Sequence, residues 1–187
     1  MEIKKEYRNS QRTKRMIRKA FAELIGEKKM LSEITVSELA ERADIAKSTF
    51  YNHYDDIYAV AEELLRELIA GLDGIMDAME ADSTNDYRVY IRSIFAFLKE
   101  NEELYRKVAD SPDAVFFIGR IKQYLSKRAF ANIKSPALSK NKTERYVQIR
   151  FYANACVDTM VDYFKGDIDM SFDDMEKTIM ALLDRMM

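Results

Sequence analysis

The stretch "ITVSELAERADIAKSTFYNHYDD", residues 34–56, decides the fold because it predicts two short helices joined by a tight turn. Thr35 and Glu38 form the capping-box pattern at the start of the first helix. Asp44 stands at the turn, and aspartate is one of the few residues other than glycine that tolerate the left-handed conformation. Ile45 follows as an expected buried plug, and "KSTFYNHY" forms the second helix. The pattern predicts a helix-turn-helix unit.

The second helix separates its residues into an apolar arc and a polar arc when it is wound at 100° per residue. Phe50, Tyr54 and Ile57 form the apolar arc, which we expect to be buried. His53 lies on the border between the arcs. The polar arc carries small, amide, phenolic and ammonium groups: Lys47, Ser48, Thr49, Tyr51 and Asn52.

These polar groups suit DNA, because a helix-turn-helix places its second helix in the major groove while the first crosses the backbone. Serine, threonine and asparagine can pair with base edges, and tyrosine or lysine with phosphates. Backbone amides at the start of the first helix can hold a further phosphate. For His53, a phosphate contact and a structural role remain equally open. The expected DNA-binding residues are Thr35, Ser37, Lys47, Ser48, Thr49, Tyr51, Asn52 and His53.

Basic residues concentrate at the beginning of the chain. The first 20 residues contain eight lysines or arginines against two glutamates, although the net charge of the whole chain is −2. A basic end on an acidic body hints at a polyanionic partner. In the helix predicted here, Arg12, Lys14 and Arg15 are either DNA contacts or ordinary solvated charges. We expect Ser10 to be the N-cap of this helix.

Helical periodicity dominates the chain, and glycine (5) and proline (2) are scarce. We find no paired strands, repeats or low-complexity tract. The sequence therefore predicts an all-α protein of about nine helices. It has an N-terminal three-helix head, residues 1–56, and a C-terminal helical-bundle domain, residues 57–187. The long helix that opens this domain has these expected apolar positions: Val60, Leu64, Leu68, Leu72, Ile75 and Met79.

The stretch at residues 34–56, after a basic first helix, resembles the DNA-binding domain of the tetracycline-repressor (TetR) family of bacterial regulators. The resemblance covers roughly residues 10–65. It rests on Thr35, Leu39, Ala40, Ile45, Lys47, Thr49, Phe50, Tyr51 and Tyr54. It implies a head joined by a fourth helix to a larger helical body, which dimerises through its last two helices and usually holds a small-molecule pocket.

Three positions depart from the family pattern. Asp44 stands where the turn usually has glycine, and aspartate can substitute. Ala46 replaces the usual serine before the second helix, which removes one N-cap bond at a cost of about 1 kcal/mol. Ile57 replaces a lysine that often contacts a phosphate. Asp55 and Asp56 make this edge less basic still, although either can cap the following helix.

Aromatic residues are frequent in the body, and at helical spacing they belong to the core first. The resemblance nevertheless implies a pocket, with these candidates: Phe97, Phe117, Tyr124, Phe151, Tyr152, Asn154 and Asp158. Asn154 and Asp158 can orient a ligand, or satisfy each other or a neighbouring helix, and the structural role is favoured. Cys156 is expected to be a buried small hydrophobe.

Catalysis and cofactors find no support in the sequence. One histidine and one cysteine cannot form the usual zinc site, and no nucleotide-binding or nucleophile fingerprint is present. We therefore expect no metal, no cofactor and no catalytic residue. The N-terminus lacks a signal peptide, and no apolar run approaches the ~20 residues that span a membrane. We expect a bacterial cytosolic protein, associated with the nucleoid when it is bound to DNA.

The leading hypothesis is a dimeric transcriptional repressor that binds a pseudo-palindromic DNA operator and is released by a small-molecule effector. The alternative is a regulator or co-activator that acts through protein partners, with weak or no direct DNA reading. The acidic body, the lysine replaced by Ile57, and Asp55 and Asp56 motivate this alternative. An all-α enzyme is a distant third option.

Overall fold

The computed structural model describes residues 2–81, 86–133 and 135–186, and in these it contains helices and connections but no strand. The nine α-helices are α1 (Glu2–Lys28), α2 (Val36–Arg42), α3 (Lys47–Tyr51), α4 (Ile57–Ala81), α5 (Tyr87–Lys99), α6 (Glu102–Ala109), α7 (Ala114–Asn132), α8 (Lys142–Lys165) and α9 (Phe172–Met186). A short 3-10 helix, η1 (Leu31–Glu33), follows α1. The predicted all-α fold is confirmed.

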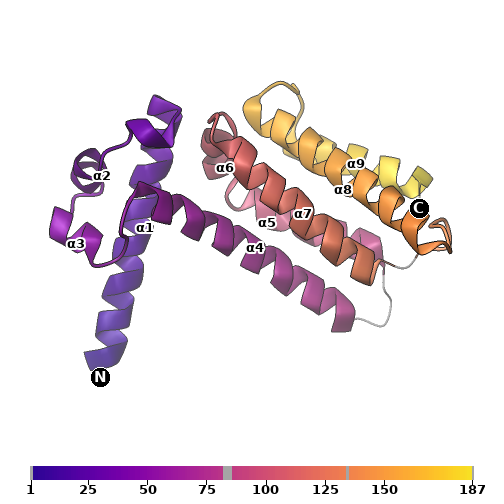
Figure 1. Cartoon of the computed structure of the whole chain (residues 1–187), viewed down its shortest axis with the longest axis horizontal. Helices are drawn as coiled ribbons and strands as arrows, with labels where there is room; N and C mark the ends of the chain where they lie inside the picture. Colours follow the sequence, from indigo (N-terminus) through magenta and orange to yellow (C-terminus); the bar gives the residue numbers. More distant parts are fainter. Residues whose placement is uncertain (1, 82–85, 134, 187) are drawn as a thin grey trace.

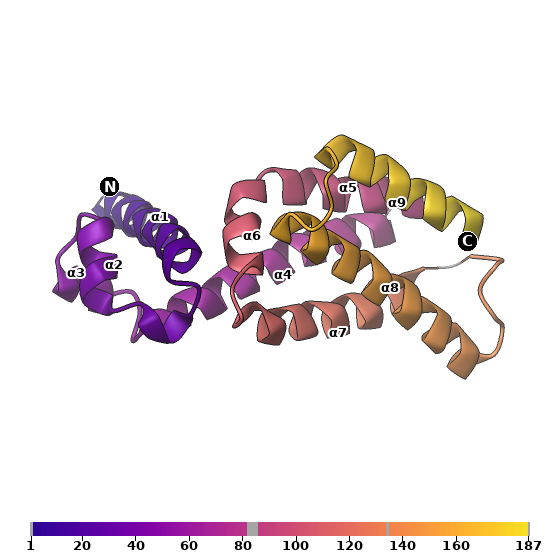
Figure 2. The same ribbon diagram turned by 90° about the horizontal axis from the view of Figure 1, so that it is seen from above.

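Helices α1 to α3 form the head at one end of the molecule, and α5 to α9 form the body at the other (Figure 1, Figure 2). Helix α4 runs from the head along the body. In the body, α7 packs along α8, α5 contacts both α4 and α9, and α6 lies between α1 and α8. This arrangement matches the head, fourth helix and body that the sequence predicts.

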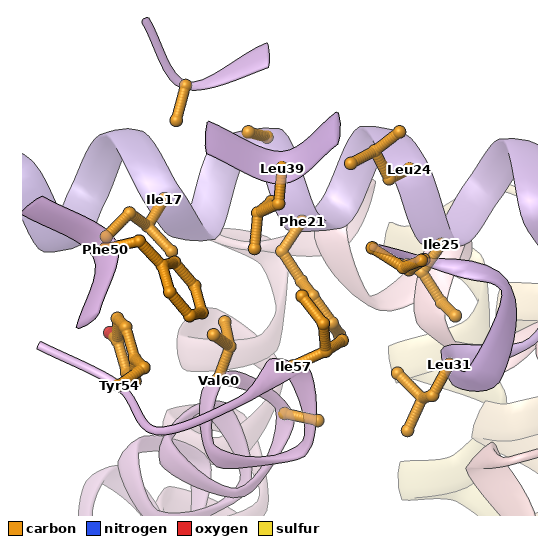
Figure 3. Close-up of a cluster of buried hydrophobic side chains, with 14 residues drawn as sticks. Ile17, Phe21, Leu24, Ile25, Leu31, Leu39, Phe50, Tyr54, Ile57 and Val60 are labelled. Carbon is orange, nitrogen blue, oxygen red and sulfur yellow. The ribbon is translucent and has the colours of Figure 1, made fainter. Parts of the chain in front are cut away.

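The head has its own hydrophobic core, drawn in Figure 3. Its buried members come from α1, η1, α2, the segment around α3 and the start of α4, and they include Ile17, Phe21, Leu24, Ile25, Leu31, Ile34, Leu39, Phe50, Tyr54, Ile57 and Val60. The apolar arc predicted for the second helix is thus buried. Ile45 packs against this core as predicted, but it is half-buried rather than fully buried.

Helix α1 is longer than the sequence predicts. It begins at Glu2, so Ser10 lies inside the helix and its prediction as an N-cap is wrong. The preceding residues "EIKKEYRN" contain glutamate, lysine and arginine, which favour helix, and no glycine or proline that would stop it. The helix ends at Lys28, and Lys29 takes a positive φ of 70°.

Local signals around the turn are confirmed. The amide of Glu38 donates to Thr35 Oγ1 at 3.2 Å, and the amide of Thr35 donates to Glu38 Oε2 at 3.2 Å, which completes the capping box. Asp44 adopts a φ of 53°, the left-handed conformation that the turn requires. Ala46 provides no side-chain cap for α3, as its methyl group dictates.

Helix α4 packs into the head core at its start and into the body further along. Its first residues, Ile57 and Val60, pack in the head core, whereas Leu72 and Met76 are buried in the body. Leu64 and Leu68 are only half-buried, although the sequence predicts them on the buried stripe. Both line a cavity in the body, so their side chains retain accessible surface. The side chain of Met79 lies outside the described part.

The head meets the body at a second place besides α4, where the end of α1 and η1 contact the link between α6 and α7. Ser111 Oγ donates to the carbonyl of Lys29 at 2.6 Å, and the amide of Leu31 donates to Asp113 Oδ2 at 2.7 Å. Lys29 also forms an ion pair with Asp110. These contacts couple the position of α1 to the body independently of α4.

Two glycines of α4 offer a matched test of packing. A Cβ added at Gly71 would lie 2.3 Å from Phe97 Cζ, whereas one added at Gly74 would meet nothing within 4 Å. We expect Gly74→Ala to raise the free energy of unfolding by up to about 1 kcal/mol through helix propensity. Gly71→Ala should lower it by about 1 kcal/mol or more, because the ring of Phe97 must move. Urea unfolding at one protein concentration measures both, and equal stabilisation by the two variants would contradict this packing.

Candidate nucleic-acid interface and ligand cavity

Helix α3 presents its polar side chains to solvent. Lys47, Ser48, Tyr51 and Asn52 are exposed, with Tyr51 57% exposed, while Thr49 and His53 are half-buried. The predicted outward orientation of this face is therefore found, although DNA contact by these residues remains a prediction.

The anchor of α3 is aromatic. Phe50 is 0% exposed, and its ring lies 5.6 Å from the ring of Tyr51 and 5.7 Å from that of Tyr54. In Figure 3, Phe50 lies beside Ile17 of α1, with Tyr54 and Val60 close by. The helix has five residues and no N-cap side chain, so packing rather than intrinsic helix stability holds it in place.

The start of α2 is a second predicted DNA-contact region, and both Thr35 and Ser37 are exposed there. The hydroxyl of Thr35 is already engaged with Glu38 in the capping box. Hydrogen bonds from Lys28 and Thr35 lower the pKa of Glu38 to about 2, so this carboxylate stays ionised at neutral pH. Any phosphate bound at Thr35 would therefore use mainly the free backbone amides of the helix start.

The end of α2 is fixed to α1 by charge. The guanidinium of Arg42 donates to both carboxylate oxygens of Glu27, at 2.9 and 3.0 Å, and lies 3.4 Å from Glu23. With the Lys28–Glu38 ion pair at the other end, α2 is held to α1 at both termini. Lys28 and Arg42 thus have acidic partners within the head.

The basic residues of α1 fall into two classes. Arg12 and Arg15 are exposed and have no ion-pair partner among the described residues. Lys14 differs, because its Nζ lies 2.6 Å from Glu63 Oε1 and 5.4 Å from the centre of the Tyr54 ring. Tyr54 also donates its hydroxyl to Glu63.

Glu63 of α4 is a residue that the sequence interpretation missed. Burial alone raises its pKa, but hydrogen bonds from Lys14 and Tyr54 lower it overall, so the carboxylate is ionised. The three side chains join α1, the end of the α3 segment and α4. Lys14 therefore has a structural partner, and we do not retain it as a candidate DNA contact.

The link between α3 and α4, residues 52–56, contains no lysine or arginine. Asp55 and Asp56 are exposed, and Asp56 Oδ1 accepts a hydrogen bond from the amide of Ala59 at 2.8 Å. The possible N-cap role of Asp56 is thus confirmed. Ile57 is buried in the head core, so the position where the family often has lysine cannot contact a phosphate here.

A partly open cavity of about 390 Å³, a volume suited to a small organic molecule, lies in the body and extends to the head core. Of the candidate ligand residues, Phe97, Phe117 and Tyr152 line it. Cys156 also lines the cavity and is partly rather than fully buried, and its surroundings raise its thiol pKa to about 11 by desolvation. This thiol is protonated at neutral pH.

The other four ligand candidates are not in the cavity wall. Tyr124 donates its hydroxyl to Asp73 of α4, and Phe151 is 65% exposed. Asn154 is half-buried outside the lining. Asp158 forms an ion pair with Lys122 of α7 at 2.5 Å, which is the structural role that the sequence favours for it. Helical spacing in the sequence does not tell which residues of α8 face the cavity and which lie on its other faces.

In the part of the chain that the structure describes, no group of three or more histidine, cysteine, aspartate or glutamate side chains could hold a metal ion. None of the described helices is both long enough and apolar enough to cross a bilayer.

Comparisons with known proteins agree with this geometry. Residues 85–185 match a TetR family model described as a transcriptional regulator C-terminal region, which is more than half of the chain. An uncharacterised HTH-type transcriptional regulator, YxbF of Bacillus subtilis (strain 168), is 38% identical over 58 residues. That match spans 31% of this chain and only 14% of the relative's length.

Two solved structures share the fold. The dihydroxyacetone kinase operon activator DhaS superposes with a TM-score of 0.65 at 19% identity, over 93% of this chain and 96% of that one. A TetR transcriptional regulator from Streptococcus agalactiae 2603V gives a TM-score of 0.64 at 21% identity, over 95% and 96% of the two chains. With the helix-turn-helix head and the matched C-terminal region, these findings establish that the chain belongs to the TetR family of transcriptional regulators.

Proposed function

We propose that the protein is a dimeric DNA-binding repressor that reads a pseudo-palindromic operator through α3 and is released by a small molecule bound in the body. The observation that carries this proposal is the exposed polar face of α3, held on the buried side chain of Phe50. We assign residues 1–56 to DNA binding and residues 57–187 to dimerisation and ligand binding, with α4 packing in both. The cytosol is the compartment that fits this role.

The contact set proposed for each half-site combines base readout and phosphate binding. Lys47 and Tyr51 suit phosphates, and the small polar groups of α3 suit base edges. Arg12 and Arg15 of α1 add two exposed cations without ion-pair partners among the described residues. The proposed contacts are Thr35, Ser37, Lys47, Ser48, Thr49, Tyr51, Asn52 and His53, joined by these two arginines.

Dimerisation through α8 and α9 is supported by their exposed apolar side chains. Val147 and Phe151 of α8 and Leu182 of α9 are exposed, although a monomer would gain from covering them. Two copies related by a two-fold axis would present two α3 helices to successive major grooves, which predicts the symmetric operator.

Release by an effector is supported by the position of the cavity. Phe21, Ile25 and Leu31 line it and are also members of the head core. Ser111 and Asp113, which bond the end of α1 and η1, line it as well. A molecule that enlarged this cavity would therefore act on both connections between head and body, and so on the spacing of the two α3 helices.

A second candidate is a regulator that acts through protein partners. It is favoured by the exposed carboxylates of Asp55 and Asp56 beside α3, and by the loss of a phosphate-binding lysine at Ile57. The name of the structural neighbour DhaS, an operon activator, leaves the direction of regulation open for proteins of this fold. Tight binding to a protein with no enrichment of any duplex would favour this candidate.

The test is selection of sequences from a random duplex pool by the purified protein. We expect a two-fold symmetric motif from the native protein, and its loss in the double variant Lys47→Ala with Tyr51→Phe. Removal of one phosphate cation and one hydroxyl per head should weaken binding at least about tenfold. The variant Tyr58→Phe, which changes an exposed tyrosine of α4, serves as a matched control and should keep the motif. A folded dimer that enriches no sequence would contradict direct DNA reading.

A further inference from the structure

The chemistry of the cavity wall restricts what it can hold. No lysine, arginine or histidine lines it among the described residues. Among the described residues the wall contains two acidic side chains, Glu67 and Asp113, and both are already engaged. Glu67 forms an ion pair with Arg18, and Asp113 accepts the amide of Leu31 at 2.7 Å. The remaining wall is formed mainly by aliphatic and aromatic side chains from α1, η1 and α4 to α9.

Such a wall disfavours ligands that place a charged group against it. Moving a carboxylate, phosphate or ammonium group from water into an apolar site costs several kcal/mol unless an opposite charge receives it. No unpaired opposite charge is present in the described wall. The cavity is partly open to the surface, so a ligand can enter it. Its mainly aliphatic and aromatic lining favours an apolar molecule.

Tyr90, Asn101, Tyr105 and Tyr152 line the cavity, and their side chains form no hydrogen bond among the described residues. Tyr90 of α5, which is 4% exposed, is the most deeply buried of these four. Its hydroxyl oxygen is not among the fully buried atoms without a partner in the described part of the chain, so it keeps surface that a ligand can reach. Burial raises the pKa of this phenol, so it remains a protonated donor at any ordinary pH. A hydroxyl with accessible surface in a mainly apolar wall can donate to a ligand that supplies an acceptor, and this hydrogen bond favours such a ligand.

We infer that the cavity binds an uncharged, mainly apolar molecule that carries a hydrogen-bond acceptor such as a hydroxyl, ether or carbonyl oxygen, and that Tyr90 Oη donates to this acceptor. This inference rests on the proposed function for its regulatory meaning, but the binding itself can be measured without DNA. It assigns Tyr90 as the residue that orients the ligand. Sequence reasoning had no signal for this, because Tyr90 is one of many aromatic residues at helical spacing.

The test uses the full-length protein and the neutral fluorescent probe N-phenyl-1-naphthylamine. Decan-1-ol, decanoate and decylammonium, which share a ten-carbon chain, are compared as competitors at neutral pH. We expect decan-1-ol to displace the probe at a concentration at least about tenfold lower than either ion. Displacement by decanoate or decylammonium at equal or lower concentration would overturn the inference while leaving a ligand cavity in place.

Two variants of the cavity wall, Tyr90→Phe and Ala153→Leu, locate the binding site, and Tyr58→Phe is their control. Tyr90→Phe should weaken decan-1-ol about fivefold through loss of one hydrogen bond, with probe affinity changed less than about twofold. Tyr58→Phe, at an exposed position outside the cavity wall, should change neither. Ala153→Leu places extra volume in the wall and should weaken both probe and alcohol. An unchanged alcohol affinity in Tyr90→Phe, or unchanged probe binding in a folded Ala153→Leu, would overturn the assignment.

The same samples separate this inference from the proposed function. DNA binding is measured first without any ligand, on the selected duplex. Failure to bind DNA together with selective alcohol binding would contradict the proposed repressor function and support the inferred ligand class. Normal DNA binding with no probe binding would keep the DNA-binding function. It would overturn both the inferred ligand class and release through this cavity.

Discussion

Replacement of Phe50 by alanine should lower the free energy of unfolding by about 3–5 kcal/mol, the range for a buried phenylalanine. The side chain is 0% exposed and belongs to the core shared by α1, α2, the α3 segment and the start of α4. Its loss removes the main contact that fixes α3, a helix of five residues with no side-chain N-cap. Such a short helix has little stability of its own in water.

The adjacent position supplies the matched control. Tyr51 is 57% exposed, so Tyr51→Ala should change the free energy of unfolding by less than about 1 kcal/mol. This substitution should instead lower the affinity for DNA, because the hydroxyl of Tyr51 lies on the outward, polar face of α3. Urea unfolding of both variants at one protein concentration, since a dimer's stability depends on concentration, checks the contrast. Equal destabilisation by the two variants would mean that the two arcs of α3 are wrongly assigned.

The features predicted correctly from sequence are those fixed by residues close together in the chain. The capping box joins Thr35 to Glu38 over three positions, and the left-handed turn needs only the identity of Asp44. The two arcs of α3 follow from helical geometry once one face is known to be apolar. These signals locate the helix-turn-helix, and with it the proposed DNA surface.

The features that the sequence did not reveal depend on contacts between distant segments. Lys14 and Glu63 are 49 positions apart, and only the crossing of α1 and α4 brings them together. Four of the seven ligand candidates lie outside the cavity wall, because the rotation of α7 and α8 decides which side chains face inward. Tyr90 stands out only when its burial and its place in the cavity wall are both known. Periodicity identifies an apolar face but does not say what it faces.

DNA affinity should fall about a thousandfold when monovalent salt rises from 50 to 200 mM. Lys47, Arg12 and Arg15 are exposed cations without ion-pair partners among the described residues, so a dimer would contact about six phosphates with them. A slope of about −0.9 per phosphate gives a total near −5 in a plot of log K against log salt. A fourfold rise in salt then corresponds to about three decades. An affinity that barely changed would contradict phosphate binding by these residues.

The comparison of Arg15 with its neighbour Lys14 makes this prediction specific to the structure. Arg15→Met should reduce the slope by about 2, since each dimer loses two phosphate contacts. Lys14→Met should leave the slope within about 0.5, because the ammonium is engaged by Glu63 at 2.6 Å rather than by DNA. Titration of labelled operator at four salt concentrations measures both slopes. An equal reduction in the two variants would mean that Lys14 leaves Glu63 when DNA binds, and the junction between α1 and α4 would then rearrange on the operator.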